Sequence, residues 1–192
     1  MKIKKGFSLV ELLVVVSIAT LMLTALVFQQ NKWNDKLSVN TQIYEMGLML
    51  RQAQVYGLGV REYAGGVGDK FDKAYGVHFD TNTPDRYYFF ADANKNSKFD
   101  ASEVIETKIF TRGVRINRVC GRVGASQNCG GALTQASATF LRPEPKAVIK
   151  FINNGGNELP TYSAPLDVYL RSANGTENSI QVNSNGYISV SQ

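Results

Sequence analysis

The longest apolar run of the chain covers residues 7–28. Glu11 is the single charged residue in these 22 positions. At about 1.5 Å of rise per residue, a helix of this length measures roughly 33 Å, which is enough to cross the hydrocarbon core of a bilayer. The pattern therefore predicts a transmembrane helix that carries one carboxylate near its start.

The helical pattern continues beyond this apolar run. Steps of four and three residues connect Val39, Ile43, Met46, Leu50 and Ala53. Such spacing puts all five on one face of a helix. No proline interrupts the segment, and Gly57 and Gly59 supply a stop. We predict one continuous helix from Phe7 to about Tyr56, whose second half lays an apolar stripe on a globular domain.

After Gly57 the period of the pattern changes to two. Tyr75, Val77 and Phe79 alternate with more polar positions that include His78, which is typical of a half-buried strand. We expect His78 on the polar face, solvated or hydrogen-bonded rather than catalytic. Further strands are predicted at residues 86–91, 104–110, 114–119, 147–152, 166–171, 179–182 and 187–190.

Asn-Gly pairs at residues 174–175 and 185–186 predict hairpin turns. The glycine-rich stretch 65–70 lacks the spacing of a phosphate-binding loop and is interpreted as a plain loop. The fold class expected is α+β, with a long N-terminal helix packed on a C-terminal antiparallel sheet domain. The expected segments are a leader at 1–6, a membrane span at 7–28, an amphipathic helix to about 57 and a β-rich domain at 58–192.

Charge changes the picture mainly at the N-terminus. The chain has 21 basic and 16 acidic residues, and Lys2, Lys4 and Lys5 all precede the apolar run. The remaining 18 basic residues nearly balance the acidic ones, so total charge gives no support to general nucleic-acid binding. The positive-inside rule places the N-terminus in the cytoplasm and the body outside. Trp33 lies where an interfacial anchor is expected.

Glu11 needs a partner or a function, because a charge at this depth costs roughly 2.5–3.5 kcal/mol on insertion. The apolar run contains no lysine or arginine. A cut before Phe7 would create a free amine four residues from Glu11, on the same helix face. That amine could pair with Glu11 of its own chain or of a neighbour. The alternatives are an ordinary secretory signal, which suits neither the length nor Glu11, and a fortuitous glutamate in a plain anchor.

The stretch KKGFSLVELLVVVSIA closely resembles the class III signal sequence of type IV pilins and type II secretion pseudopilins. This resemblance implies cleavage after Gly6 by a prepilin peptidase and N-methylation of Phe7. It also implies that Glu11 pairs with the N-terminus of another subunit during assembly. The partners expected are other pilin subunits, the peptidase and the inner membrane. The expected location is the inner membrane, single-pass, and then a pilus or pseudopilus.

A second informative stretch is DANKNSKFDASE at residues 92–103. It fits the calcium-loop template of alternating oxygen ligands, except that Ser97 replaces the glycine at the sixth position. The candidate ligands are Asp92, Asn94, Asn96, the Lys98 carbonyl, Asp100 and Glu103. The alternative is a polar hairpin loop held by Asx-turns. No cofactor is required by the sequence, and Ca²⁺ is the one candidate.

The block YGVHFD followed by YYFFADANKNSKFDASE also resembles the GspH/FimT-like minor pseudopilins. The function expected is therefore that of a minor pilin or pseudopilin, a structural subunit of a type IV pilus or a type II secretion pseudopilus. The resemblance leaves one alternative, which is a DNA-binding minor pilin of a competence or DNA-uptake filament.

Residues 107–143 contain six basic residues and no acidic one. Candidate contacts to DNA phosphates are Lys108, Arg112, Arg115, Arg118 and Arg122. The alternative is a solvated sheet face. The spacing of three between Arg112, Arg115 and Arg118 would not show all of them on one side of a flat strand.

The two cysteines, Cys120 and Cys129, cannot form a four-ligand zinc site with the single histidine unless carboxylates join. If the body lies outside the cytoplasm, they should form a disulfide. The alternative is a pair of free buried thiols. An enzyme is not expected, because the sequence lacks G-x-S-x-G and H-E-x-x-H motifs and a cysteine close to histidine, although carboxylate chemistry stays open.

Overall fold

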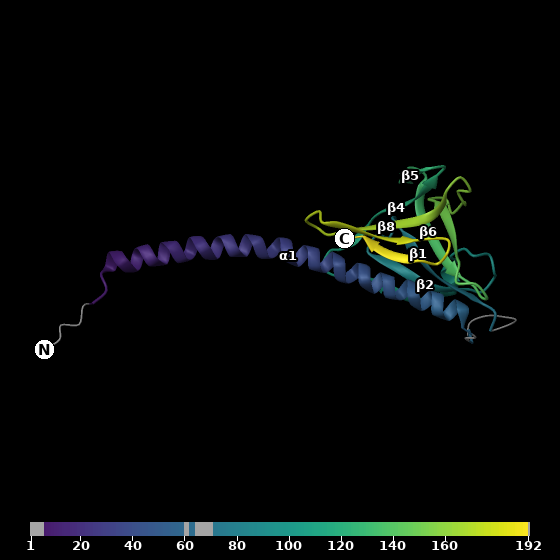
Figure 1. Cartoon of the computed structure of the whole chain (residues 1–192), viewed down its shortest axis with the longest axis horizontal. Coiled ribbons are helices and arrows are strands. Elements are labelled where there is room, and N and C mark those ends of the chain that lie inside the picture. The colour runs from purple at the N-terminus through teal and green to yellow at the C-terminus, as the bar shows by residue number, and fades with distance from the viewer. Residues whose placement is uncertain (1–5, 60–61, 64–70, 192) are drawn as a thin grey trace.

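The computed structural model consists of one long helix and a β-rich body (Figure 1). It describes residues 6–59, 62–63 and 71–191, with the backbone alone for 28–32. Leader residues 1–5 and the predicted loop 65–70 lie outside the described residues. Helix α1 runs without a break over Leu9–Leu58, which confirms the prediction of one continuous helix. The Gly59 N–H then donates to the Val55 carbonyl and ends it, as the glycines in this region predict.

The body contains two five-stranded antiparallel sheets. The first, sheet A, has the order β3-β2-β1-β6-β7. It is formed by β1 (Ala74–Asp80), β2 (Arg86–Asp92), β3 (Val104–Ile109), β6 (Leu133–Phe140) and β7 (Ala147–Asn153). A short 3₁₀ helix, η1 (Ala101–Glu103), leads into β3.

The second sheet, sheet B, has the order β10-β9-β8-β4-β5. It is formed by β4 (Arg115–Val123), β5 (Ser126–Cys129), β8 (Ser163–Arg171), β9 (Glu177–Val182) and β10 (Ile188–Ser191). The Asn-Gly turns join β8 to β9 and β9 to β10, and Gly175 and Gly186 adopt φ values of 97° and 83°. These left-handed conformations are the reason that glycine occupies the second turn position.

The core lies where the second half of α1 meets both sheets. The predicted stripe of α1 is fully buried: Val39, Ile43, Met46, Leu50 and Ala53 each have 0% of their surface exposed. It packs with Tyr75, Val77 and Phe79 of β1 and with Val168 and Ile180 of sheet B. Gly57 permits a close approach at the end of the helix, because a Cβ there would lie 2.2 Å from the Phe140 carbonyl oxygen.

Three features differ from the sequence prediction. Strands β5 and β6 were not predicted, and the body has two sheets where one was expected. Strand β1 is buried on both faces and not only one, so His78 is also buried. Its second face is covered because Phe99, from the loop between β2 and β3, lies over it.

Candidate assembly helix and cation loop

Gly6 and Phe7 lie just before α1, in irregular backbone. Phe7 is exposed, and nothing lies within 4 Å of the position that a Cβ of Gly6 would take. Glu11 is exposed in the first turn of the helix, where a carboxylate interacts favourably with the free backbone N–H groups. No described basic side chain lies within ion-pair distance of Glu11. The carboxylate is therefore accessible to a partner from outside.

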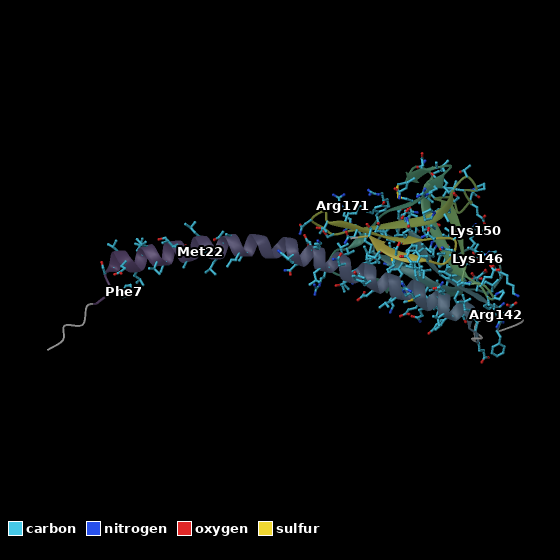
Figure 2. All side chains as sticks on the ribbon, in the orientation of Figure 1. Phe7, Met22, Arg142, Lys146, Lys150 and Arg171 are labelled. Carbon is cyan, nitrogen blue, oxygen red and sulfur yellow. A yellow bond between two sulfur atoms is a disulfide. The ribbon has the colours of Figure 1, made fainter. Side chains whose placement is uncertain are left out.

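The apolar part of α1 projects away from the body (Figures 1 and 2). Its segment Leu9–Val27 has 19 residues and a mean hydropathy of 2.5, and none of it is buried against the rest of the chain. Nineteen apolar residues in a helix are long enough to span a bilayer. A large exposed apolar surface of this kind requires lipid or other protein around it.

A second apolar stripe follows the outer side of α1 beside the body. Its exposed members are Leu37, Tyr44, Leu48 and Val55. Their spacing of seven, four and seven residues places them on one face, roughly opposite the buried stripe. Trp33, also exposed, lies four residues before Leu37 and continues the stripe toward the membrane segment. We call these five residues the outer stripe.

A groove lies beside the outer stripe. It is formed by α1 and β10, and Tyr44, Leu48, Tyr187 and Val190 are among its lining residues. Sequence reasoning did not identify the outer stripe, although its heptad-like spacing is visible in the sequence. The buried stripe has the same kind of spacing, and the sequence does not say which of two opposite stripes meets the body.

The candidate ligands at residues 92–103 form one compact loop between β2 and β3. Asp92 is buried and its carboxylate accepts hydrogen bonds from the N–H groups of Asn96 (3.0 Å) and Ser97 (2.7 Å). The Asn94 side-chain oxygen accepts from Asn96 N–H at 3.0 Å. The Asn96 side-chain oxygen accepts from Lys98 N–H at 2.7 Å. Asn94 also donates its side-chain N–H to Asp100 and its backbone N–H to Glu103, so all six candidate residues belong to one network.

Glu103 closes the loop from its other end. Its Oε1 accepts from the N–H groups of Ala93 (2.9 Å) and Asn94 (3.1 Å), whereas its Oε2 is buried and has no hydrogen-bond partner among the described residues. Burial raises the pKa of Glu103, the two N–H groups oppose this change, and the charges of Asp92 and Asp100 add to it.

The loop is tied to the body at several points. Phe99 stacks on His78, and Lys98 Nζ donates to the Gly156 carbonyl at 2.6 Å. Lys73 Nζ donates to the Ala93 carbonyl at 2.7 Å. In the described part of the chain, no three His, Cys, Asp or Glu side chains stand close enough to form a metal centre by themselves. A cation here would therefore also need the amide and carbonyl oxygens.

Cys120 and Cys129 form a disulfide, as predicted for an exported body. They are cross-strand partners of β4 and β5, with Cα atoms 4.1 Å apart. Cys120 is fully buried, whereas β5 is exposed throughout and lies at the edge of sheet B. The disulfide therefore holds a polar edge strand on its neighbour.

The five candidate phosphate contacts lie on β3, on the following turn and on β4. A bulge near Asn117 shifts the register between β4 and β8, so Ile116 and Val119 both face the core. Arg115 and Arg118 consequently share the outer face, which the flat-strand argument did not anticipate.

Two of these five cations already have acidic partners. Lys108 lies 2.6 Å from Glu106, and Arg118 lies 3.0 Å from Glu177 and over the ring of Tyr169. For Arg112, Arg115 and Arg122 the structure shows no ion pair with a described residue. The structure therefore gathers no single dense basic patch from the five.

Comparison with known proteins adds one finding, at the N-terminus. A family model described as the prokaryotic N-terminal methylation motif matches residues 1–27. No curated protein and no solved structure matches the chain. The matched residues include Gly6, Phe7 and Glu11 together with nearly the whole apolar segment that projects from the body. The motif, the exposed apolar helix and the antiparallel sheet body mark this chain as a prepilin of the type IV pilin and pseudopilin kind.

Proposed function

We propose that this chain is a minor pilin or pseudopilin, a structural subunit of a type IV pilus or a type II secretion pseudopilus. A prepilin peptidase cuts after Gly6, the new N-terminal Phe7 is methylated, and the subunit enters the filament through α1. The body faces the outside of the filament. Before assembly the chain is anchored in the inner membrane, with its N-terminus in the cytoplasm.

The observation that carries this proposal is the pair of opposite stripes on α1. The buried stripe attaches the helix to the body, which leaves the outer stripe exposed in the isolated subunit. The outer stripe lies on the same helix as the apolar segment Leu9–Val27. The helix therefore presents exposed apolar surface both in the membrane segment and, along the outer stripe, beside the body. Helices of neighbouring subunits are the occupants that suit its length and spacing.

Site-specific photo-crosslinking tests this assignment. A photoreactive amino acid at Leu48, in the outer stripe, should link the subunit to α1 of a neighbouring subunit in assembled material. The matched control is Val148, which is also exposed and apolar but lies on β7 of the body. Equal yields at the two positions, or no link from Leu48 to another pilin subunit, would contradict the proposed packing.

A second candidate function is capture of DNA by the same subunit. The bulge in β4 favours it, because Arg115 and its cross-strand partner Arg171 share the outer face of sheet B with Arg118, which pairs with Glu177. Contacts of this kind would bind phosphates without reading sequence. A DNA pull-down at increasing salt concentrations distinguishes a DNA-binding subunit from a purely structural one. Retention that falls steeply with salt, and is lost when Arg115 and Arg171 are replaced by glutamine, supports DNA binding. A chain that is not retained at low salt excludes it.

A further inference from the structure

We propose that the loop from Asp92 to Glu103 is a calcium-binding site. Its ligands are the side-chain oxygens of Asp92, Asn94, Asn96, Asp100 and Glu103, with the main-chain carbonyl of Lys98. This inference does not depend on how the subunit assembles. It follows from the backbone of the loop, from its unneutralised carboxylates and from one buried oxygen that has no partner.

The backbone already has the form that a calcium loop needs. In such loops alternate residues point their oxygens inward, and a tight turn at the sixth position brings the chain around the ion. Here the N–H groups of Asn96, Ser97 and Lys98 are all bonded by side-chain oxygens of the preceding ligand positions. Lys95 and Ser97, at positions four and six, adopt left-handed φ values of 63° and 57°.

The charge in the loop is not balanced by the protein. Asp92, Asp100 and Glu103 have no described lysine or arginine within ion-pair distance. The two lysines of the loop turn outward, because Lys95 pairs with Asp72 at 2.6 Å and Lys98 donates to Gly156. A buried or half-buried carboxylate is costly without a counter-charge, so a divalent cation would remove a real electrostatic cost.

The carboxylate of Glu103 gives evidence for the ion that does not depend on the form of the loop or on its net charge. It is 4% exposed, and its Oε1 is held inside the loop by the Ala93 and Asn94 N–H groups. Its Oε2 is buried and accepts no hydrogen bond from the described residues. A buried carboxylate oxygen without a donor is rare, because leaving it unsatisfied destabilises the fold. The twelfth residue of a calcium loop is the glutamate that binds the ion with both oxygens.

The side-chain amides show where the cation would lie. The nitrogens of Asn94 and Asn96 both approach the same oxygen of Asp100, at 2.7 and 3.4 Å. Two partial positive charges thus converge on one carboxylate oxygen of the loop. The oxygens of the same two amides accept from the Asn96 and Lys98 N–H groups, and each keeps a second lone pair with which it could bind a cation beside Asp100.

The donor set favours Ca²⁺ over other divalent ions. All six ligands are hard oxygens and none is nitrogen or sulfur, which excludes a zinc-type site. Ca²⁺ accepts a flexible shell of six to eight oxygens, whereas Mg²⁺ demands a near-ideal octahedron and keeps several waters. With three carboxylates, and serine in place of glycine at the sixth position, we expect a Kd of about 10⁻⁴ to 10⁻³ M, the range of extracellular modules.

An ion at this place would join two strands of sheet A. Asp92 ends β2 and Glu103 directly precedes β3, the edge strand of the sheet. The same loop carries Phe99, which covers His78. Calcium would therefore hold the edge strand and the aromatic cover of sheet A together in the folded body.

Calorimetric titration of the full chain tests the site. The detergent-solubilised protein is stripped with a chelator and titrated with CaCl₂, then in parallel with MgCl₂. We expect one Ca²⁺ per chain and a rise in melting temperature at millimolar Ca²⁺, because the ion binds only the folded state. Mg²⁺ should bind at least tenfold more weakly. The proposal would be overturned if Ca²⁺ released or absorbed no heat of binding and left the melting temperature unchanged. Equal affinity for Ca²⁺ and Mg²⁺ would also overturn it.

Three variants locate the ion. Glu103→Gln retains an acceptor for the two N–H groups but loses the charge, and should weaken binding at least tenfold. Asp100→Asn, at a half-exposed position, should do the same with less risk to the fold. Ser97→Gly supplies the residue suited to the left-handed turn and should strengthen binding several-fold. Unchanged affinity in both Asp100→Asn and Glu103→Gln would refute the assigned ligands.

The matched control is Glu106→Gln. Glu106 lies three residues beyond Glu103 on β3 and pairs with Lys108 at the surface. This variant removes one negative charge, as Glu103→Gln does, but from the edge strand β3 that follows the loop. Its calcium affinity should stay within twofold of that of the unmodified chain. A loss as large as that of Glu103→Gln would mean that general surface charge, and not the loop, attracts the ion.

Discussion

The imidazole of His78 and the ring of Phe99 stack face to face, with centroids 4.1 Å apart and planes inclined by 6°. His78 lies in the middle of β1, whereas Phe99 comes from the loop between β2 and β3. His78 Nδ1 also lies 2.9 Å from the hydroxyl of Ser137. The stacking covers the second face of sheet A, and burial lowers the pKa of His78 to about 3.

The first prediction is that the free energy of unfolding falls as the pH is lowered from 7 to 5. The unfolded chain protonates His78 near pH 6.5, but the folded chain does so only near pH 3. In this window the unfolded state binds more protons, so acid favours it. The expected loss between pH 7 and pH 5 is about 2 kcal/mol. Chemical denaturation of the detergent-solubilised full chain at the two pH values measures it.

The control is His78→Gln, which keeps a hydrogen-bonding side chain beside Ser137. The sequence contains a single histidine, so this variant has none left to titrate. Its stability should be nearly constant between pH 7 and pH 5. A flat curve for the unmodified chain would show that His78 is not shielded, and an equally steep curve for the variant would assign the pH dependence to other groups.

The second prediction concerns Glu11. Replacing Glu11 by alanine removes the cost of a carboxylate in lipid, so membrane insertion should survive or improve. Incorporation into filaments should fall strongly, because the amine of the neighbouring subunit loses its counter-charge as it enters the apolar bundle. The measurement compares the amount of the variant in the membrane with its amount in sheared or purified filaments.

Glu11→Gln is the matched variant, because it keeps the shape of the side chain and removes the charge. It should behave like Glu11→Ala. If membrane abundance and incorporation fall together, Glu11 serves stability or processing. If incorporation is unchanged for both variants, inter-subunit pairing through Glu11 is wrong for this protein.

The third prediction concerns cleavage after Gly6. A residue without a side chain suits a narrow peptidase site, and the peptide bond lies in irregular, exposed backbone. The N-terminal peptide of assembled subunits should begin at N-methylated Phe7 in mass spectra. Gly6→Leu should leave the precursor uncut in the membrane, whereas Ser8→Ala, two residues beyond, should be cut normally. Assembled material that still begins at Met1 would be incompatible with the proposed assembly route.

The fourth prediction concerns the disulfide between Cys120 and Cys129. It closes a short loop around the turn from β4 to β5, and on the chain-entropy model such a loop contributes on the order of 2–3 kcal/mol. Replacing both cysteines by alanine should lower the melting temperature, because β5 has exposed side chains and little apolar surface to hold it on β4.

Thiol labelling provides the control for this prediction. Without reductant, an alkylating reagent should label neither cysteine of the unmodified chain in denaturant, and with reductant it should label both. The melting temperature of the variant with alanine at both positions should not change when reductant is added. Labelling of both thiols before reduction would argue that the body resides in a reducing compartment.

The sequence by itself determined the features that depend on local periodicity. A stripe of apolar residues spaced by three and four identified Ile43 and Leu50 as buried, because a helix repeats every 3.6 residues whatever it packs against. The two Asn-Gly turns were predictable for a similar reason, since only a left-handed glycine fits the turn. The prepilin motif is likewise local and needs no tertiary structure.

Strand β6 was decided by tertiary packing. Its residues Ala136, Ala138 and Ser137 are small and are fully buried beside β1, so no strong apolar alternation marks it. Small side chains are required where strand and helix approach closely, as Gly57 and Phe140 do at its end. Strand β5 carries no apolar pattern either, because it is an exposed edge that pairs with β4 through its backbone.

For the loop at 92–103 and for helix α1, too, some features follow from the local sequence and others from tertiary packing. The sequence determined which oxygen-bearing residues occupy the loop at 92–103, since their spacing is local. Only the folded chain decided that Glu103 Oε2 is buried without a described partner and that Phe99 covers His78, because both depend on sheet A lying beneath the loop. Likewise, periodicity predicted the buried stripe of α1, whereas the outer stripe on the opposite side was recognised only in the folded chain. Which side meets the body and which is left for another subunit was decided by where the two sheets close around the helix.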